Sequence, residues 1–236
     1  MAGFHIEHFG CRAARADGEA IAGNLRALAE HEPLAADMVV VNTCSVTAEA
    51  DRAARAFIRK AHRRNPAAKI VVTGCYAQRA PEELAGMAGV AAVVGNSHKA
   101  LAPEIIAALA RGKKVGAVDS TAFVPLASLL VTSAQAAPIW VDDRFAHSFI
   151  EDTHLADSAL IEGAQTRPNL KIQEGCGNRC TFCVIPFTRG PSKSLARARV
   201  LSEVEQFVEA GGKELVLSGI NLGRWGREVS DAGRDS

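Results

Sequence analysis

Short apolar runs alternate with longer amphipathic stretches through the first hundred residues. Three runs have strand length: Phe4 to Gly10, Val39 to Val41 and Ile70 to Val72. Between the first two, Asp17 to His31 repeats apolar residues at helical spacing, and the apolar face comprises Ile21, Leu25 and Leu28. Strands that alternate with helices predict an α/β fold with a parallel sheet.

Two further helices complete this pattern. Thr47 is a suitable N-cap for a helix that runs through Ile58 and stops at Asn65-Pro66. The stretch from Ser97 to Arg111 predicts another helix, closed by Gly112, and Lys114 to Val118 predicts a last strand.

The alternation resumes after residue 166. Asn169 to Gln173 predicts a strand, Ala198 to Ala210 a helix, and Glu214 to Ser218 a second strand, which together form the start of a (β/α) barrel. We therefore expect an N-terminal domain at 1–119, an interdomain linker at 120–166 and a partial barrel at 167–236. The apolar stretch 122–141 is interrupted by prolines and polar residues, so no membrane-spanning helix is expected.

The net charge of the chain does not indicate a nucleic-acid partner. The chain has 236 residues, of which 48% are hydrophobic, and its net charge is +1, so it can bury two modest cores but carries no global basic field. An RNA surface would have to be local, and solvated helix faces explain the same charges equally well. The candidates are Arg189, Lys193, Arg197 and Arg199, and Arg59, Lys60, Arg63 and Arg64.

Three cysteines in one loop carry the clearest chemical signal. Cys176, Cys180 and Cys183 have the spacing C-x3-C-x2-C. A cluster of four irons and four sulfides takes four ligands, so three thiolates leave one iron open to a small molecule, as catalytic zinc sites keep an open position. Gly175 precedes the first ligand, where a backbone without Cβ can turn tightly.

Other interpretations of this loop remain open. The cysteines could be small buried apolar groups, although the loop is too polar for a core strand. Zinc would need a fourth ligand, and the nearest upstream candidates, His147 and His154, lie outside the usual spacings. Disulfides are disfavoured because the N-terminus lacks the features of a secretory signal, so we expect a cytoplasmic protein in a reducing compartment.

The other three cysteines recur at one phase of the α/β pattern. Cys11, Cys44 and Cys75 are separated by 33 and 31 residues, and each follows a predicted strand. The carboxyl ends of parallel strands share one edge of a sheet, where open α/β sheets bind ligands. We expect the three thiols to converge there and to hold a second cluster with an open iron; three merely buried thiols are the alternative.

Several stretches resemble the radical S-adenosylmethionine (radical SAM) methylthiotransferase family across nearly the whole chain. Among its members, the sequence most resembles the enzymes that modify threonylcarbamoyladenosine in tRNA. It is less similar to the isopentenyladenosine tRNA enzymes and to those that modify an aspartate of a ribosomal protein. The stretches are Phe9-Gly-Cys-Arg, Asn42-Thr-Cys-Ser-Val-Thr, Val72-Thr-Gly-Cys-Tyr-Ala-Gln, Val94-Gly-Asn, Lys171-Ile-Gln-Glu-Gly-Cys and Cys180-Thr-Phe-Cys-Val-Ile-Pro-Phe-Thr-Arg-Gly-Pro.

The resemblance implies a methylthio transfer to C2 of N6-threonylcarbamoyladenosine beside the anticodon. It implies two 4Fe–4S clusters, two SAM molecules, a tRNA partner, an electron donor such as a flavodoxin or ferredoxin, and no membrane. The second cysteine trio would bind the radical cluster that chelates SAM, and Phe182 would pack beside the adenine. Cys11, Cys44 and Cys75 would bind the auxiliary cluster, which carries the sulfur for insertion.

The family pattern also implies more chain than follows Trp225. Further βα units and a small C-terminal RNA-binding β domain are absent, so we expect a truncated form with an unpaired strand edge. Two hypotheses outside the family remain. One is an iron–sulfur electron carrier, which would normally use four cysteines per cluster. The other is a zinc-stabilised interaction module.

Overall fold

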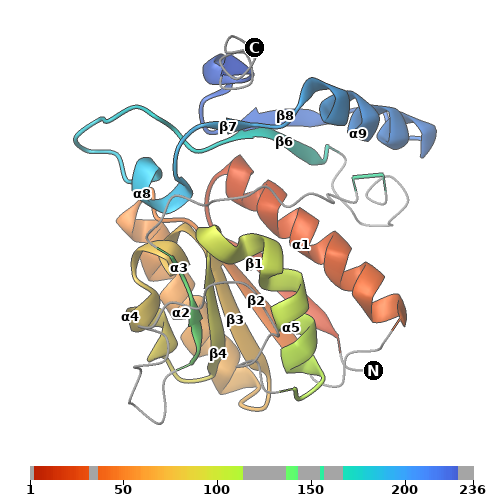
Figure 1. The fold of residues 1–236 in the computed structure, drawn as a ribbon. Coiled ribbons are helices and arrows are strands. Elements are labelled where there is room, and N and C mark those ends of the chain that lie inside the picture. Colours follow the sequence, from red (N-terminus) through yellow and green to blue (C-terminus); the bar gives the residue numbers. More distant parts are fainter. Residues whose placement is uncertain (1–2, 32–36, 114–136, 143–154, 157–166, 228–236) are drawn as a thin grey trace.

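A computed structural model describes residues 3–31, 37–113, 137–142, 155–156 and 167–227, which form two sheets (Figure 1). The larger sheet is parallel throughout and has the strand order β1-β2-β3-β4-β5. Its strands are β1 (Phe4–His8), β2 (Met38–Thr43), β3 (Lys69–Gly74), β4 (Val90–Gly95) and β5 (Ile139–Trp140). The predicted α/β class with a parallel sheet is confirmed.

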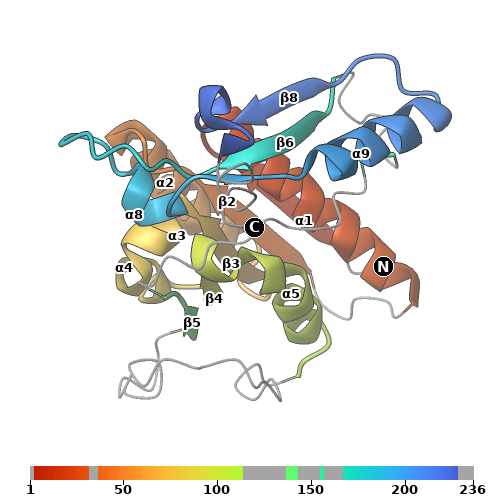
Figure 2. The same cartoon turned by 45° about the horizontal axis from the view of Figure 1, so that its top comes forward.

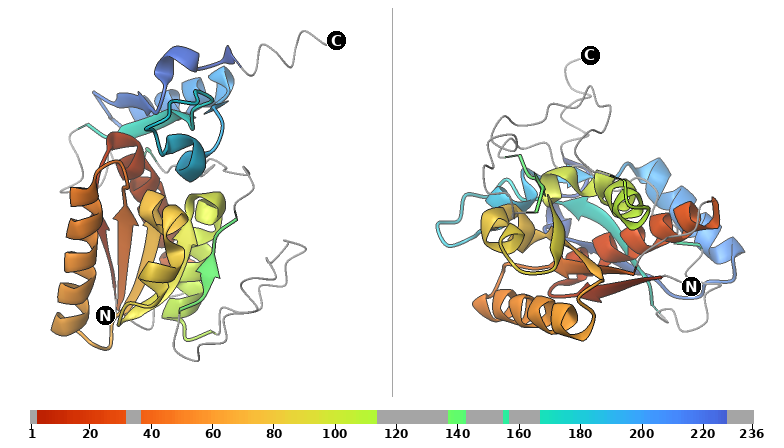
Figure 3. Two further views of the ribbon diagram at one scale, coloured as in Figure 1. Left: turned by 90° about the vertical axis from the view of Figure 1, so that its left-hand side faces the viewer. Right: turned by 90° about the horizontal axis from the view of Figure 1, so that it is seen from below.

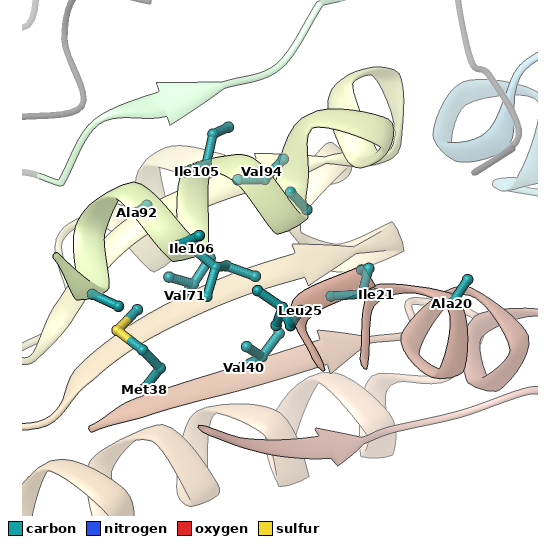
Figure 4. Packing of buried hydrophobic residues seen from close by; sticks show 13 residues of the cluster. Ala20, Ile21, Leu25, Met38, Val40, Val71, Ala92, Val94, Ile105 and Ile106 are labelled. Carbon is teal, nitrogen blue, oxygen red and sulfur yellow. The ribbon is translucent and has the colours of Figure 1, made fainter. Parts of the chain in front are cut away.

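Helices cover both faces of this sheet. On one face, α1 (Arg12–His31) and α5 (Ala102–Ala110) pack on the strands, and Leu25 and Ile106 meet the sheet around Val71 (Figure 4). On the other face lie α2 (Ala48–Arg64), α3 (Cys75–Arg79) and α4 (Pro81–Ala85). Successive strand residues serve opposite faces, as the period of two in a strand requires.

The local signals place most boundaries, with two corrections. The Oγ1 of Thr47 accepts a hydrogen bond from the amide of Ala50, so Thr47 caps α2 as predicted. Helix α1 was predicted to begin at Asp17 but begins at Arg12. Its first turns are rich in alanine, which favours helix without contributing an obvious apolar stripe.

The predicted helix from Ser97 to Arg111 is divided in the structure. A 3-10 helix, η1 (Asn96–Leu101), precedes α5, and Pro103 stands at the start of α5, where its missing N–H costs nothing. The predicted strand from Lys114 to Val118 lies outside the described residues. The fifth strand, β5, comes instead from within the stretch predicted as a linker and pairs with β4.

The C-terminal unit is a small mixed sheet with the strand order β7-β6-β8. Strands β6 (Asn169–Glu174) and β8 (Val216–Gly219) are parallel and are joined through α9 (Arg197–Glu209), so the predicted βαβ unit is present. The antiparallel strand β7 (Lys193–Ser194) was not predicted. Val200 and Phe207 of α9 are buried, whereas Val208 is 58% exposed.

This unit packs on the N-terminal one. Strands β6 and β8 contact α1, and Figures 1 and 2 show them lying along that helix. The short helix α8 (Ile185–Arg189) contacts α3, which begins directly where β3 ends, so the C-terminal unit covers the carboxyl edge of the large sheet (Figure 3). None of the helices in the described parts of the chain combines the length and apolarity needed to cross a membrane.

Candidate metal centre

The first cysteine trio lies at the carboxyl edge of the large sheet. Cys44 directly follows β2 and Cys75 directly follows β3, while Cys11 lies between the end of β1 and the start of α1. Cys44 and Cys75 are buried, whereas Cys11 is exposed. Neighbouring strands therefore deliver all three thiols to the edge at which the sequence predicted them.

Glycines allow two of these strand ends to approach closely. Gly10 has a φ of +115°, and a Cβ on it would lie 2.0 Å from the Cβ of Cys44. Gly74 has a φ of +98°, and a Cβ there would lie 2.2 Å from the carbonyl oxygen of Thr43. Side chains at these two positions would push the cysteine-bearing loops apart.

Cys11 and Cys44 are close enough to share a proton. A hydrogen bond from the Cys44 thiol, helped by the charge of Arg189, lowers the pKa of Cys11 to about 5. The same hydrogen bond and burial raise the pKa of Cys44. One member of the pair is thus a thiolate at neutral pH, which is the form that binds metals.

Two nitrogen donors meet the sulfur of Cys75. The Nδ2 of Asn96 lies 3.4 Å from this sulfur and also donates to the carbonyl oxygen of Thr188 at 2.7 Å. The Nε of Arg189 lies 3.3 Å from the same sulfur. Asn96 belongs to the N-terminal unit and Arg189 to the C-terminal one, so both units contribute donors to one cysteine.

A buried cluster of charges continues from Arg189 and joins the two units. We call it the buried charge cluster. Its carboxylates each contact several cations, and every side chain in it is at most 6% exposed. Its members are Asp17 of α1, Lys99 of η1, Lys171 and Glu174 of β6, and Arg189 of α8.

The pKa values in this cluster follow from burial and from these contacts. Burial alone would raise the pKa of Glu174. The charges of Lys171, Lys99 and Arg189 outweigh this effect and lower the pKa below its ordinary value, so the carboxylate is ionised. Burial lowers the pKa of Lys99 to about 8 in spite of Asp17 and Glu174. Burial also opposes the charge of Arg189, but Cys75 and the two carboxylates keep its pKa well above the ordinary value.

The second cysteine trio lies in the loop between β6 and α8. Cys176 and Cys183 are half-buried, and Cys180 is exposed. Gly175 has a φ of +69°, and a Cβ on it would lie 2.0 Å from the carbonyl oxygen of Pro191. The amide of Cys176 then donates to Gly190 at 3.0 Å, which fixes the start of the loop. Asn221 places its Nδ2 3.7 Å from the Cys176 sulfur.

Phe182 lies in the same loop and is 91% exposed. The ring is open to solvent, so its faces are available to a ligand. Gln173 secures the strand end below: its Nε2 donates to the carbonyl oxygen of Gly175 at 2.9 Å, and its Oε1 accepts from the amide of Asn221 at 2.6 Å.

The side chains of the two trios suit iron–sulfur clusters better than a single metal ion. Among the described residues, no three Cys, His, Asp or Glu side chains could hold a single metal ion. A four-iron cluster does not need such convergence, because each thiolate binds a different iron. All six cysteines are free thiols, each trio is gathered in one region, and N–H donors reach the sulfur of Cys75. The residues fit iron–sulfur clusters better than a single ion.

The two groups of basic residues considered for an RNA surface differ in their exposure to solvent. Arg189 was a candidate for an RNA surface, but it is 1% exposed and belongs to the buried charge cluster, so that prediction is wrong. The second group, on α2, is exposed near the helix end that leads into the start of β3. It therefore lies toward the opposite edge of the sheet from the cysteines. Its members are Arg59, Lys60, Arg63 and Arg64.

Sequence reasoning missed Asn96 and the buried charge cluster as parts of the site. A signal existed for the cluster, because Lys171 interrupts a predicted strand and Asp17 stands beside the apolar face of a predicted helix. Charged residues at such positions are rarely buried without partners. Which charges meet could not be read from the sequence, since Asp17 and Arg189 are 172 residues apart.

The sequence is similar to a described protein family and to several characterised proteins. Residues 3–95 match a family described as "Uncharacterized protein family UPF0004". The chain is 36% identical over 196 residues to the threonylcarbamoyladenosine tRNA methylthiotransferase MtaB of Bacillus subtilis, covering 83% of this chain and 38% of that protein. It is 38% identical over 191 residues to the MtaB of Aquifex aeolicus, covering 81% of this chain and 40% of that protein.

A relative named for another substrate also matches. The ribosomal protein uS12 methylthiotransferase RimO of Chloroflexus aurantiacus is 31% identical over 232 residues, which covers 96% of this chain and 48% of that protein. The chain thus spans less than half the length of each of these curated relatives.

Proposed function

Because the chain belongs to the methylthiotransferase family, we propose that it carries both cysteine centres of a tRNA methylthiotransferase. The reaction adds a methylthio group to C2 of N6-threonylcarbamoyladenosine beside the anticodon. The observation that carries the proposal is the placement of Cys11, Cys44 and Cys75 at neighbouring strand ends, under a unit that brings in the second trio.

Each trio has its own role in this proposal. Cys176, Cys180 and Cys183 would hold the radical cluster, which would bind SAM through its amino and carboxylate groups. Cys11, Cys44 and Cys75 hold the auxiliary cluster at the sheet edge. When bound, these groups supply the one-electron chemistry and the sulfur that protein side chains lack.

The residues of the chain bind, orient and shield those groups. Gly175 and Gln173 fix the start of the loop, so the second trio stays close to the end of β6. Phe182, exposed next to Cys183, offers its ring to the adenine of SAM. Cys44 and Cys75 are buried, and Arg189 of the C-terminal unit contacts the Cys75 sulfur, so water is kept from that side of the auxiliary centre.

The partners follow from the same reaction. The substrate is a tRNA, and the electron donor is a small redox protein such as a flavodoxin or ferredoxin, all in the cytoplasm. The exposed basic group of α2 lies away from the cysteines, so a contact there would hold RNA at a distance from the reacting base. Such a contact would be to phosphates and would weaken with salt.

A second candidate is modification of an aspartate of ribosomal protein uS12. It is favoured by the similarity to the Chloroflexus aurantiacus protein, which extends over 96% of this chain. The Bacillus subtilis and Aquifex aeolicus proteins, named for threonylcarbamoyladenosine, match at 36% and 38% identity against 31% for the Chloroflexus aurantiacus protein, so the tRNA substrate is the better supported of the two.

A substrate comparison tests the proposal. The chain is reconstituted anaerobically with iron and sulfide and reduced, then supplied with SAM and one of three substrates: an anticodon stem-loop with threonylcarbamoyladenosine, the same RNA with isopentenyladenosine, or uS12. We expect methionine and 5′-deoxyadenosine release, and a methylthio mass gain on the first RNA alone. A mass gain on uS12 alone would favour the second candidate. No SAM cleavage by an iron-loaded protein would overturn the proposal.

A further inference from the structure

Arg189 stands at the meeting point of the two cysteine trios. It ends α8, which follows the loop of the second trio, yet its side chain reaches Cys75 of the first. It is 1% exposed and is the largest of the fully buried side chains in the described part of the protein. A buried guanidinium needs partners for all its N–H groups.

Two of the three guanidinium nitrogens of Arg189 have hydrogen-bond partners among the described residues. The Nε donates to the Cys75 sulfur at 3.3 Å. The Nη1 donates to Asp17 at 3.0 Å and to Glu174 at 2.7 Å. The Nη2 is buried and has no hydrogen-bond partner among the described residues.

Because the guanidinium group is planar, the direction of the free Nη2 donor follows from the direction of Nε. The N–H of Nε and one N–H of Nη2 project in parallel from the same edge of the group, and this fork matches two neighbouring anionic atoms. Since Nε points to the Cys75 sulfur, the free N–H of Nη2 points to the same side. A second acceptor beside that sulfur would complete the fork.

The charges around Arg189 also favour an acceptor beside the Cys75 sulfur. The buried charge cluster holds three cations, Lys99, Lys171 and Arg189, against two carboxylates, Asp17 and Glu174. A buried cation is unfavourable unless an anion lies nearby, and the N–H groups of Arg189 that do not meet the two carboxylates lie on the side of the Cys75 sulfur. Cys75 is the contact of this network that belongs to the first trio.

We propose that Arg189 is a positioning residue for the auxiliary cluster, with Nε held to the Cys75 sulfur and Nη2 donating to a further sulfur atom of the same cluster. The inference rests on the proposed function, since it assumes that Cys11, Cys44 and Cys75 bind a cluster. Hydrogen bonds to cluster sulfurs and nearby charge set the reduction potential. The residue that tunes the auxiliary centre thus comes from the segment that carries the radical centre.

The test isolates the auxiliary cluster in a chain whose second trio is replaced by alanine. In that background, Arg189→Lys keeps the positive charge but loses the fork, whereas Lys171→Met removes a charge from the same network without touching sulfur. Midpoint potentials are measured by redox titration followed by electron paramagnetic resonance. We expect a more negative potential for Arg189→Lys, by a larger shift than for Lys171→Met. A larger shift for Lys171→Met would mean that only the charge matters and would overturn the proposal.

A second measurement needs no substitution at Arg189 or Lys171. The same chain is labelled with 15N in its arginine guanidinium groups, and the reduced cluster is studied by pulsed magnetic resonance. We expect 15N coupling to the cluster, because the nitrogens of Arg189 lie against its sulfurs. An iron-loaded auxiliary centre without this coupling would overturn the inference alone. Failure of the three cysteines to bind iron and sulfide at all would instead overturn the proposed function.

Discussion

Arg189 of α8 donates from Nη1 to the carboxylate of Asp17 in α1 across 3.0 Å, although 172 residues separate them in the sequence. Both side chains are buried, and Lys99 and Lys171 crowd the same carboxylate. The contact between the two units is therefore ionic at its centre. Loss of the ion pair between Arg189 and Asp17 should therefore separate the two cysteine trios at a lower denaturant concentration than the one that unfolds either sheet.

Asp17→Asn tests this contact. The change leaves three buried cations against one carboxylate, and breaking a buried ion pair on one side costs about 3–5 kcal/mol. We expect a loss of that order in the free energy of unfolding, measured by denaturant titration. Glu30→Gln, on an exposed position of the same helix, is the matched control and should change stability by less than about 0.5 kcal/mol. Equal stability of the two variants would contradict an ionic contact.

Acid should weaken the same contact. Burial would raise the pKa of Asp17, but Lys171 and Lys99 outweigh it and hold the pKa below the ordinary value of about 3.9. As pH falls past that value, the unfolded chain takes up a proton that the folded chain does not, so the stabilisation by Asp17 is present above about pH 4 and is lost below it. The unfolding free energy of the parent should fall more steeply below that pH than that of Asp17→Asn. Parallel curves would contradict this assignment.

Gly10→Ala should damage the auxiliary centre. The new methyl group would lie 2.0 Å from the Cβ of Cys44, in a backbone conformation that favours glycine. We expect reduced iron binding by the first trio, measured as iron per chain with the second trio removed. Gly112→Ala is the matched control, because Gly112 has a φ of +71° but nothing within 4 Å of an added Cβ. It should cost about 1 kcal/mol of stability and no iron.

Phe182→Ala should weaken SAM binding without affecting the fold. The ring is 91% exposed, so its removal leaves no cavity, but a base-stacking contact is worth about 1–3 kcal/mol, or roughly 5- to 150-fold in affinity. Equilibrium binding of SAM to the reconstituted protein measures this. Phe187→Ala removes another exposed ring, 76% exposed, from the neighbouring helix and should leave SAM affinity unchanged. Equal effects of the two changes would remove Phe182 from the SAM site.

The hydrophobic pattern was sufficient to predict the sheet and most of its helices. Val40 and Val41 face opposite layers, as a strand buried on both sides requires, and Thr47 marks the start of α2 by ordinary capping chemistry. Helix α1 was predicted too short because alanines bury well but leave no stripe. The pairing of Ile139–Trp140 with β4 depends on tertiary contacts that no local pattern carries.

The candidate site was predictable in its cysteines and unpredictable in its supporting charges. Strand phase placed Cys44 and Cys75 at one edge, since parallel strands end on the same side. Arg189 was read as a surface charge, because a sequence does not reveal which arginines are buried. Only the docking of α8 against α3 shows that it meets Cys75.

The most direct test counts iron and acid-labile sulfide after anaerobic reconstitution. It compares the parent chain with two triple variants, Cys11→Ala with Cys44→Ala and Cys75→Ala, and Cys176→Ala with Cys180→Ala and Cys183→Ala. The account predicts about eight irons and about eight sulfides per parent chain and about half of each in either variant, because each trio holds its own four-iron cluster. A parent chain with zinc and no sulfide, or a triple variant that keeps the full iron content, would contradict it.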